Sequence, residues 1–327
     1  MLIARSLKWG KNIKVLSLFS GIGAFEKALT NLNIDYELVG FSEIDRYAIK
    51  SYCAIHGVDE SRNLGDVTKI GKLNNCIDLL VGGSPCQNIS IMSKTWTNGK
   101  PLGLKGNESS LFFDFVRILN ENLPKYFVFE NVRNLLSSNN GEDFELVKKL
   151  FSENYNIKYQ LMNSSDYGIP QTRRRIFIVG IRKDIVKEFK FPKKQPLLIT
   201  AKSLLESSVD DKYYLTEKMY KTVMSTGTKD WYANPKTDQD IALPLVRTMH
   251  KMHRASTDNY YHTEYKPVGK TNLRRLTPLE CFRLQGFSDV DYKKVKNINM
   301  SDTQMYMQVG NSITVKVVEE IFKNLFK

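Results

Sequence analysis

One stretch of the chain places a cysteine where it could act as a nucleophile. An apolar run from Ile77 to Val81 predicts a short buried strand, which stops at the pair Gly82-Gly83. Pro85 stiffens the following turn, and Cys86 comes directly after it. Open α/β sheets bind ligands at the carboxyl ends of their strands, which is where this loop puts the thiol. A small packing residue at a strand end is the alternative for Cys86, and this stretch alone does not decide between the two.

Two acidic residues also follow predicted strands. Glu43 lies 22 residues after Gly21, about the spacing at which an acid accepts hydrogen bonds from a ribose diol. Glu130 ends another short apolar run. If these strands are parallel, Glu43, Glu130 and Cys86 meet at one edge of the sheet. The alternative for Glu43 is a solvated helix cap.

A glycine turn lies between the first predicted strand and the first predicted helix. Ser20-Gly21-Ile22-Gly23 follows an apolar run, and Ala24 begins a segment with apolar residues at helical spacing. Glycine permits such a turn and the close approach of a ligand, so the pattern is typical of a nucleotide-type cradle. Many ordinary turns carry the same glycines. A weaker strand-like segment closes at Gly65-Asp66-Val67, where a polar and an apolar group could contact an adenine ring.

A run of arginines precedes another predicted strand. Arg173-Arg174-Arg175 leads into Ile176 to Gly180, so we expect Arg173 and Arg175 on one face of a strand. Two guanidinium groups on one face suit an anion, a base carbonyl or an ion pair with Glu130. The alternative is a solvated charge run, in which lysine and glutamate would be mixed.

The apolar pattern along the chain predicts alternating strands and helices, followed by an irregular, basic part. We expect strands at 13–19, 36–41, 77–81, 126–129, 157–162 and 176–180, and helices at 24–32, 111–119, 143–154, from Pro278, and 315–326. The polar, glycine-containing segment 88–106 is expected to be a lid. Residues 190–194 resemble a linker, and 200–265 suits a nucleic-acid surface or any solvated small domain.

Composition narrows the classes of protein. The 327 residues include 48 Lys and Arg against 35 Asp and Glu, a net charge of +13 that favours polyanionic partners. The four cysteines show neither paired spacing nor a zinc-ligand pattern, so we expect no disulfide and no structural metal. We find no signal-peptide pattern and no apolar run long enough to span a membrane. The expectation is therefore a soluble, cytoplasmic protein that does not contact the membrane.

In this order, the segments closely resemble the DNA cytosine-5 methyltransferase family of bacterial and phage type. The resemblance runs from about Ile13 to the C-terminus and leaves out the variable region near 190–270. Its most specific motifs are Gly83-Ser84-Pro85-Cys86-Gln87, Phe129-Glu130-Asn131-Val132, Gln171-Thr172-Arg173-Arg174-Arg175, Arg275-Leu276-Thr277-Pro278 and Gln308-Val309-Gly310-Asn311-Ser312. It implies an α/β fold, with a Rossmann-like methyltransferase sheet and a second, smaller, irregular target-recognition domain.

The resemblance assigns roles to the catalytic candidates. Cys86 would add as a thiolate to C6 of a flipped-out cytosine. Glu130 would engage the ring nitrogen and the exocyclic amine, and Arg175, supported by Arg173, would hold the base carbonyl. The cofactor would be S-adenosyl-L-methionine. Its expected binding residues are Phe19, Gly21, Ile22, Gly23, Glu43, Ile44, Asp66, Val67, Pro85, Leu111, Asn311 and Ser312.

The resemblance also predicts the organisation of the chain and its partners. We expect a catalytic and cofactor-binding domain at 1–188, a target-recognition domain at 189–301, and a C-terminal segment at 302–327 whose helix packs back onto the catalytic domain. The expected partner is double-stranded DNA, bound by a monomer, with a separately acting restriction endonuclease as an optional further partner. The alternatives are a tRNA cytosine-5 methyltransferase and a catalytically inactive DNA-binding homologue. A nicotinamide dehydrogenase would use the glycine turn and Glu43 but gives Cys86 no role.

Overall fold

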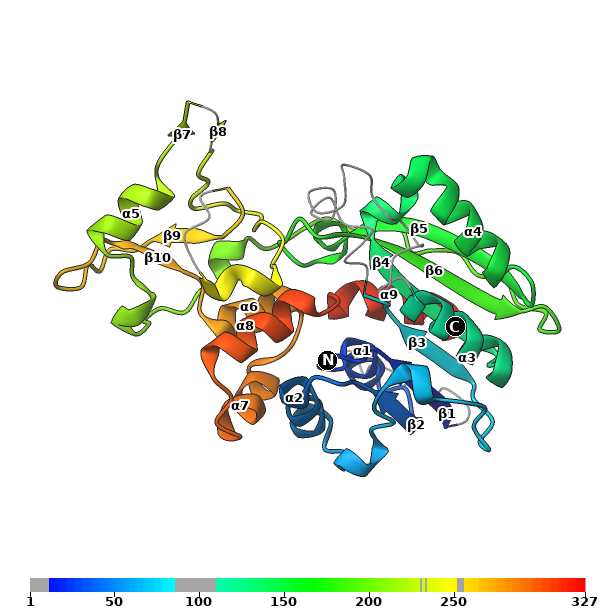
Figure 1. The fold of residues 1–327 in the computed structure, drawn as a ribbon. Helices are drawn as coiled ribbons and strands as arrows, with labels where there is room; N and C mark the ends of the chain where they lie inside the picture. Colours follow the sequence, from blue (N-terminus) through cyan, green and yellow to red (C-terminus); the bar gives the residue numbers. More distant parts are fainter. Residues whose placement is uncertain (1–11, 86–109, 230, 233, 252–255, 327) are drawn as a thin grey trace, which may run out of the picture. The chain divides into compact units, whose positions relative to one another are not determined.

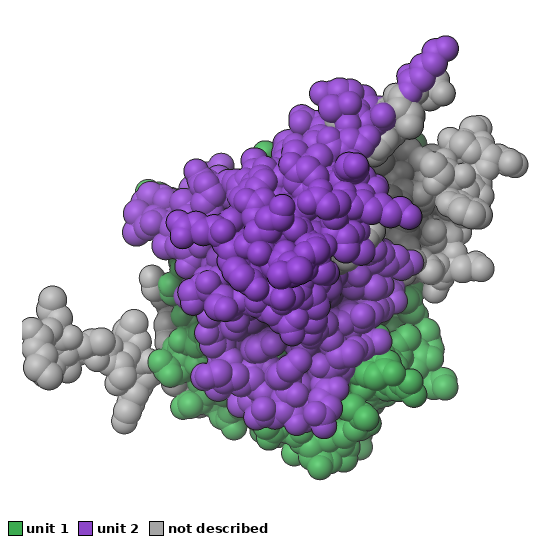
Figure 2. Space-filling view, turned by 90° about the vertical axis from the view of Figure 1, so that its left-hand side faces the viewer, with its two compact units in different colours: residues 1–162, 174–193, 318–327 green, residues 163–173, 194–317 purple. Residues whose placement is uncertain are grey.

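The chain forms two compact units in a computed structural model (Figure 2). The structure describes residues 12–85, 110–229, 231–232, 234–251 and 256–326. Unit 1 consists of 1–162, 174–193 and 318–327, and unit 2 of 163–173 and 194–317. Residues 163–173 and 302–317 cluster with unit 2. The functional domain boundaries expected from the sequence stay a prediction.

Unit 1 is built on a mixed sheet with the strand order β2-β1-β3-β4-β6-β5 (Figure 1). The strands are β1 (Ile13–Leu18), β2 (Tyr36–Ser42), β3 (Leu79–Gly82), β4 (Tyr126–Val132), β5 (Tyr155–Asn163) and β6 (Arg174–Arg182). Strands β1 to β4 pair in parallel, and β6 runs antiparallel to β4. The parallel arrangement expected from the sequence is confirmed, so the segments that follow β1, β2 and β3 lie at the same edge of the sheet as the end of β4.

Helices cover both faces of this sheet. They are α1 (Ala24–Asn31), α2 (Arg46–His56), α3 (Ser110–Asn122), α4 (Glu142–Phe151) and the C-terminal part of α9 (Val315–Phe326). Helices α3 and α4 share one hydrophobic core with β1, β3, β4 and β6. On the other face, Phe322 of α9 contacts Phe25 of α1 at 6.2 Å between ring centroids, and Phe326 contacts Tyr126 of β4 at 5.9 Å.

Strand β4 is anchored by an aromatic cluster. Phe127 and Phe129 point to the same face of the strand and pack against rings from α3 and α4, including Phe115 and Phe151. Phe115, Phe127, Phe129 and Phe151 are fully buried, so their removal from water contributes strongly to the stability of unit 1. The cluster fixes the strand immediately before Glu130.

Unit 2 combines short helices with two small two-stranded sheets. Its elements are α5 (Glu217–Val223), β7 (Gly227–Thr228), β8 (Trp231–Tyr232), β9 (Tyr260–His262), β10 (Leu273–Arg275), α6 (Pro278–Gln285), α7 (Asp289–Asn297) and α8 (Asp302–Asn311). Helix α6 begins at Pro278, as expected, and Thr277 and Glu280 form a reciprocal capping box around its first turn. Across the ranges described, no helix combines the length and the apolar character needed to cross a bilayer.

Two local predictions are wrong. The segment 65–67 is not a strand: Asp66 accepts a hydrogen bond from the Thr68 backbone and starts the short 3-10 helix Val67–Lys69. The last predicted strand begins at Arg174, so Arg173 lies outside it and does not alternate with Arg175 on one strand face. At Asp66 the side chain accepts the hydrogen bond that starts the 3-10 helix, which apolar spacing does not reveal.

Candidate active site

The glycine turn after β1 has an unusual backbone. Phe19, Gly21 and Gly23 all have left-handed φ angles, of 54°, 55° and 79°. A non-glycine residue in this region is strained, and such strain concentrates at functional sites. A Cβ added at Gly21 would meet no atom within 4 Å, so the turn borders open space. Ile22, by contrast, is buried and anchors the turn to unit 1.

Glu43 is tied to this turn, as the spacing predicts. Its Oε2 accepts a hydrogen bond from the Gly21 backbone N–H at 2.8 Å, and its Oε1 accepts from Ile44 and Asp45, both at 2.9 Å. Asn63 holds the Glu43 backbone from the other side, donating to its carbonyl at 3.0 Å and accepting from its N–H at 3.1 Å. Sequence reasoning missed Asn63, because it follows the short 3-10 helix Glu60–Arg62, which carries no recognisable motif. The carboxylate is therefore fixed beside the open side of Gly21.

The residues expected at the adenine differ in exposure. The Ile44 side chain is 76% exposed, beside Glu43. Asp66 is half-buried, and hydrogen bonds from Thr68 hold the pKa of its carboxyl group below its ordinary value. Val67 is only 4% exposed and belongs to the hydrophobic core. Ile44 thus offers an apolar surface, whereas the Val67 side chain supports the segment from inside.

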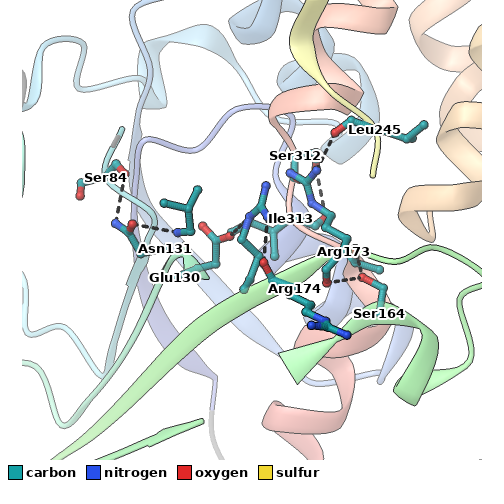
Figure 3. A network of polar contacts seen from close by, with 12 residues as sticks. Ser84, Glu130, Asn131, Ser164, Arg173, Arg174, Leu245, Ser312 and Ile313 are labelled. Carbon is teal, nitrogen blue, oxygen red and sulfur yellow. Dashed lines mark hydrogen bonds and ion pairs between the residues drawn. The ribbon is translucent and has the colours of Figure 1, made fainter. Parts of the chain in front are cut away.

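The loop after β3 closely approaches Glu130 at the end of β4. A Cβ added at Gly83 would lie 2.7 Å from Glu130 Oε2 and 3.2 Å from the Glu130 carbonyl oxygen. Asn131 donates to the Ser84 carbonyl at 3.5 Å, so the two segments are also joined next to the acid (Figure 3). Cys86 and the predicted lid at 88–106 lie outside the described residues. The loop that leads to Cys86 nevertheless starts in contact with Glu130.

Glu130 and Arg175 form an ion pair. Arg175 Nε lies 3.0 Å from Glu130 Oε1, and the two side chains are 22% and 12% exposed. Arg175 also donates through Nη1 to the Arg174 carbonyl at 2.9 Å. The antiparallel pairing of β4 with β6 places Val132 opposite Arg175. This register brings the side chains of Glu130 and Arg175 to the same end of the two strands. The ion pair is one of the interactions that the arginine run predicts.

Arg173 has a different place from Arg175. Its guanidinium group donates within unit 2 to the carbonyls of Leu245 at 2.8 Å, Gly310 at 3.2 Å and Ser312 at 2.7 Å (Figure 3). Gln171 contributes a further link, donating to Leu284 at 2.7 Å. The expected convergence of Arg173 with Arg175 on one strand face is therefore wrong, because Arg173 is occupied with backbone carbonyls that lie far away in the sequence.

The remaining cofactor candidates are divided between the units. Pro85 is exposed at the end of the loop after β3, and Leu111 of α3 packs against the core of unit 1. Asn311 is exposed at the end of α8, and Ser312 is buried with its carbonyl bound to Arg173. Asn311 and Ser312 belong to unit 2, so their contribution to a cofactor site stays a prediction.

A glycine turn tied to an acid, beside a second acid paired with an arginine at the same sheet edge, defines an α/β protein of the nucleotide-cofactor-binding class. The sequence model for C-5 cytosine-specific DNA methylases matches residues 13–327. The chain belongs to this family, as its motifs indicate, and is a DNA (cytosine-5-)-methyltransferase.

Individual relatives agree with the family assignment. The chain is 33% identical to the orphan methyltransferase M.SPRI of Bacillus phage SPR, over 96% of this chain and 97% of the phage protein. It is 34% identical to the type II methyltransferase M1.ScrFI of Lactococcus lactis subsp. cremoris, over 96% and 78% of the two chains. The solved structure of the Entamoeba histolytica methyltransferase EhMeth matches with a TM-score of 0.75 and 21% identity, covering 97% of this chain and 98% of that one. The Rossmann-like methyltransferase fold expected from the sequence is confirmed.

Proposed function

We propose that the chain transfers a methyl group from S-adenosyl-L-methionine to C5 of a cytosine flipped out of a specific short sequence in duplex DNA. The observation that carries this proposal is the close approach of Gly83 to Glu130, since it brings the start of the Cys86 loop to the acid that is paired with Arg175. A thiol, an acid and a guanidinium group are the three groups needed to activate a cytosine ring. Flipping is required because C6 is inaccessible to a thiolate inside a stacked duplex.

The residues divide the chemistry between them. The Cys86 thiolate adds to C6 and makes C5 nucleophilic. Glu130 would offer a proton to the ring nitrogen. Its carboxyl group is positioned by Arg175, which contacts Oε1, and its Oε2 lies next to Gly83. Arg175 would hold the base carbonyl and offset the charge that develops there. After methylation of C5, a water or hydroxide removes the C5 proton and the Cys86 thiolate leaves.

The residues of unit 1 fit the proposed cofactor. The open side of Gly21 accommodates a ligand close to the backbone, the Glu43 carboxylate suits a ribose diol, and the exposed Ile44 suits an aromatic ring. When bound, S-adenosylmethionine would supply an electrophilic methyl group. Phe19 and Gly23, with their left-handed backbone, would hold the turn in shape.

Unit 2 is the proposed target-recognition part of the enzyme. Recognition of duplex DNA needs cations for phosphates and polar or aromatic side chains for base edges. The net charge of +13 on the whole chain favours a polyanionic partner, and Tyr232 of the β7–β8 hairpin, at 77% exposure, offers an aromatic side chain for such a contact. Arg173 would support catalysis indirectly, by fixing the carbonyls of Leu245, Gly310 and Ser312 within this unit.

We expect Gly83→Ala to reduce methyl transfer about tenfold or more, because displacing a catalytic group by about 1 Å has large effects on rate. The added Cβ would displace the flexible end of Glu130, so the free energy of unfolding should fall by less than about 1 kcal/mol. Steady-state kinetics and urea unfolding measure the two quantities. The control is Gly71→Ala, because a Cβ at Gly71 meets nothing within 4 Å. Equal activity of the two variants would contradict the contact between Gly83 and Glu130.

Covalent trapping tests the proposed nucleophile. A duplex in which the target cytosine carries fluorine at C5 has no proton to lose there, so the Cys86 adduct should persist after methyl transfer. We expect a protein–DNA species that survives denaturation with the wild type and is absent with Cys86→Ser. A trapped complex that still forms with Cys86→Ser would assign the nucleophile to another residue.

A further inference from the structure

A buried acid lies directly behind the glycine turn and has no role in the proposed chemistry. Glu26, in the first turn of α1, is 1% exposed. Ser17 of β1 is also 1% exposed, and Tyr52 of α2 is fully buried. Both Glu26 carboxyl oxygens, Ser17 Oγ and Tyr52 OH are buried, and within the described part of the chain none of them makes a hydrogen bond of ordinary geometry, although the Ser17 and Tyr52 hydroxyls lie close enough to lower the pKa of Glu26. Such groups are costly to bury, so a cluster of them in one place calls for a functional explanation.

The surroundings of Glu26 favour its neutral form. Burial raises the pKa of Glu26, and the nearby hydroxyl groups of Ser17 and Tyr52 only partly oppose that shift. Burial raises the pKa of Tyr36 to about 12, with the charge of Glu26 as a further cause. Burial and then Glu26 also raise the pKa of Tyr52. Among the described residues, the groups that act on the pKa of Glu26 are the hydroxyls of Ser17 and Tyr52 and the Glu26 backbone N–H, none of which is a cation. A buried carboxylate without a cation is strongly disfavoured.

Tyr52 connects this acid to the glycine turn. A Cβ added at Gly23 would clash with His56 Nε2 and lie 2.8 Å from Tyr52 Cε2, so α2 packs directly against the turn. His56 Nε2 lies 3.1 Å from the Ile22 carbonyl oxygen. The Tyr52 ring stacks on Phe41 with 4.0 Å between centroids and contacts His56 at 4.6 Å. A shift of Tyr52 would therefore be transmitted to Ile22 and Gly23.

We propose that Glu26 is a positioning residue whose neutral carboxyl group, between Ser17 and Tyr52, holds α1 and α2 together and so keeps the glycine turn in the shape that binds S-adenosylmethionine. The inference rests on the proposed cofactor. A neutral carboxyl group can donate one hydrogen bond and accept others, which suits two hydroxyl groups on opposite elements. An ionised Glu26 can only accept, and its buried charge would push the elements apart.

The sign of the pH dependence follows from the raised pKa. Glu26 is neutral below its folded-state pKa, and the arrangement is complete there. As the pH rises through that value, Glu26 ionises and the affinity for S-adenosylmethionine falls. Among the described residues, the other titratable groups facing the cluster are Tyr36, Tyr52, Cys53 and His56, of which the two tyrosines and Cys53 have raised pKa values.

Calorimetric titration of the full chain with S-adenosylmethionine, from about pH 6 to about pH 9, tests the inference across a range above the ordinary glutamate pKa. Glu26→Gln mimics the neutral acid, so it should bind within about twofold of the wild type at low pH. Across the range, the wild type should lose about fivefold more affinity than Glu26→Gln. Glu26→Ala should bind about tenfold more weakly at every pH. The amine of the cofactor titrates equally with every protein, and Glu153→Gln, on an exposed residue, controls for the substitution itself.

Identical pH profiles for the wild type and Glu26→Gln would overturn the inference, and they do so even if Glu26→Ala does not fold. Hydrogen exchange of segment 19–26 in the cofactor-free protein gives an independent readout. Exchange should become faster at high pH in the wild type, relative to Glu26→Gln, and equal exchange would also overturn the inference. A further outcome is that exchange responds as expected while neither the wild type nor any variant binds S-adenosylmethionine. In that case the proposed cofactor is wrong and Glu26 positions the turn for another purpose. This outcome would overturn the cofactor part of the inference.

Discussion

Glu130→Gln is expected to lower kcat for DNA methylation about 10²- to 10⁴-fold, the usual contribution of a general acid. The glutamine amide has nearly the shape of the acid but cannot supply a proton. It also weakens the 3.0 Å ion pair with Arg175, so the guanidinium group loses its orientation. Affinity for S-adenosylmethionine should stay within about twofold of the wild type, because Glu130 lies outside the proposed cofactor residues.

A glutamate-to-glutamine substitution at an exposed position separates the effect on the chemical step from an effect on folding. Glu145 of α4 has a side chain that is 72% exposed, and among the described residues it forms an ion pair with Lys148 across one helical turn. Glu145→Gln should leave both kcat and the unfolding midpoint almost unchanged. The proposed role of Glu130 would be contradicted if Glu130→Gln kept more than about a tenth of the wild-type kcat.

Glu280→Gln is expected to lower the free energy of unfolding by about 3–5 kcal/mol, the usual cost of breaking a buried ion pair. Arg274 and Glu280 have side chains that are 1% and 0% exposed, and they form two hydrogen bonds, of 2.9 Å and 2.7 Å. Glu280 also accepts from the backbone N–H groups of Glu206 and Thr277, both at 2.8 Å. The substitution leaves the Arg274 charge buried without compensation and disturbs the start of α6.

A double variant and an exposed pair provide the controls for Glu280. Arg274→Met/Glu280→Gln removes both charges, so urea unfolding should show that at least about half of the lost stability returns. Glu217 and Lys266, in the same unit, are about two-thirds exposed and 3.9 Å apart. Glu217→Gln should therefore change stability by less than about 0.5 kcal/mol. If Glu280→Gln were as mild as Glu217→Gln, the buried pair would not stabilise unit 2 as described.

The regular elements could be predicted from the sequence because their signals are local. The apolar run before Gly82 forms β3, and the pattern Thr277-Pro278 starts α6 through a capping box. The last helix has the predicted bounds, Val315–Phe326. The Gly21–Glu43 contact could also be predicted, because a parallel strand–helix–strand unit brings residues at this spacing to one edge of the sheet.

Contacts between distant segments could not be predicted in the same way. The arginine run does not show that Arg173 binds carbonyls near 245 and 310, since that depends on how unit 2 folds. Nor does the pattern reveal that Val67 is buried or that Asn63 holds Glu43. The arginine run predicts the Glu130–Arg175 pair as one of several options, but no local signal specifies the antiparallel placement of β6 beside β4 that forms it.

The most direct measurement is transfer of a labelled methyl group from S-adenosylmethionine to unmethylated duplex DNA and, in parallel, to tRNA. The account predicts label at cytosine C5 of the DNA with the wild type, none with Cys86→Ser, and none on tRNA with either protein. Mapping the label would give the target sequence. Label on tRNA alone would contradict the proposed substrate, and absence of label from both nucleic acids, with S-adenosylmethionine bound, would contradict the proposed reaction.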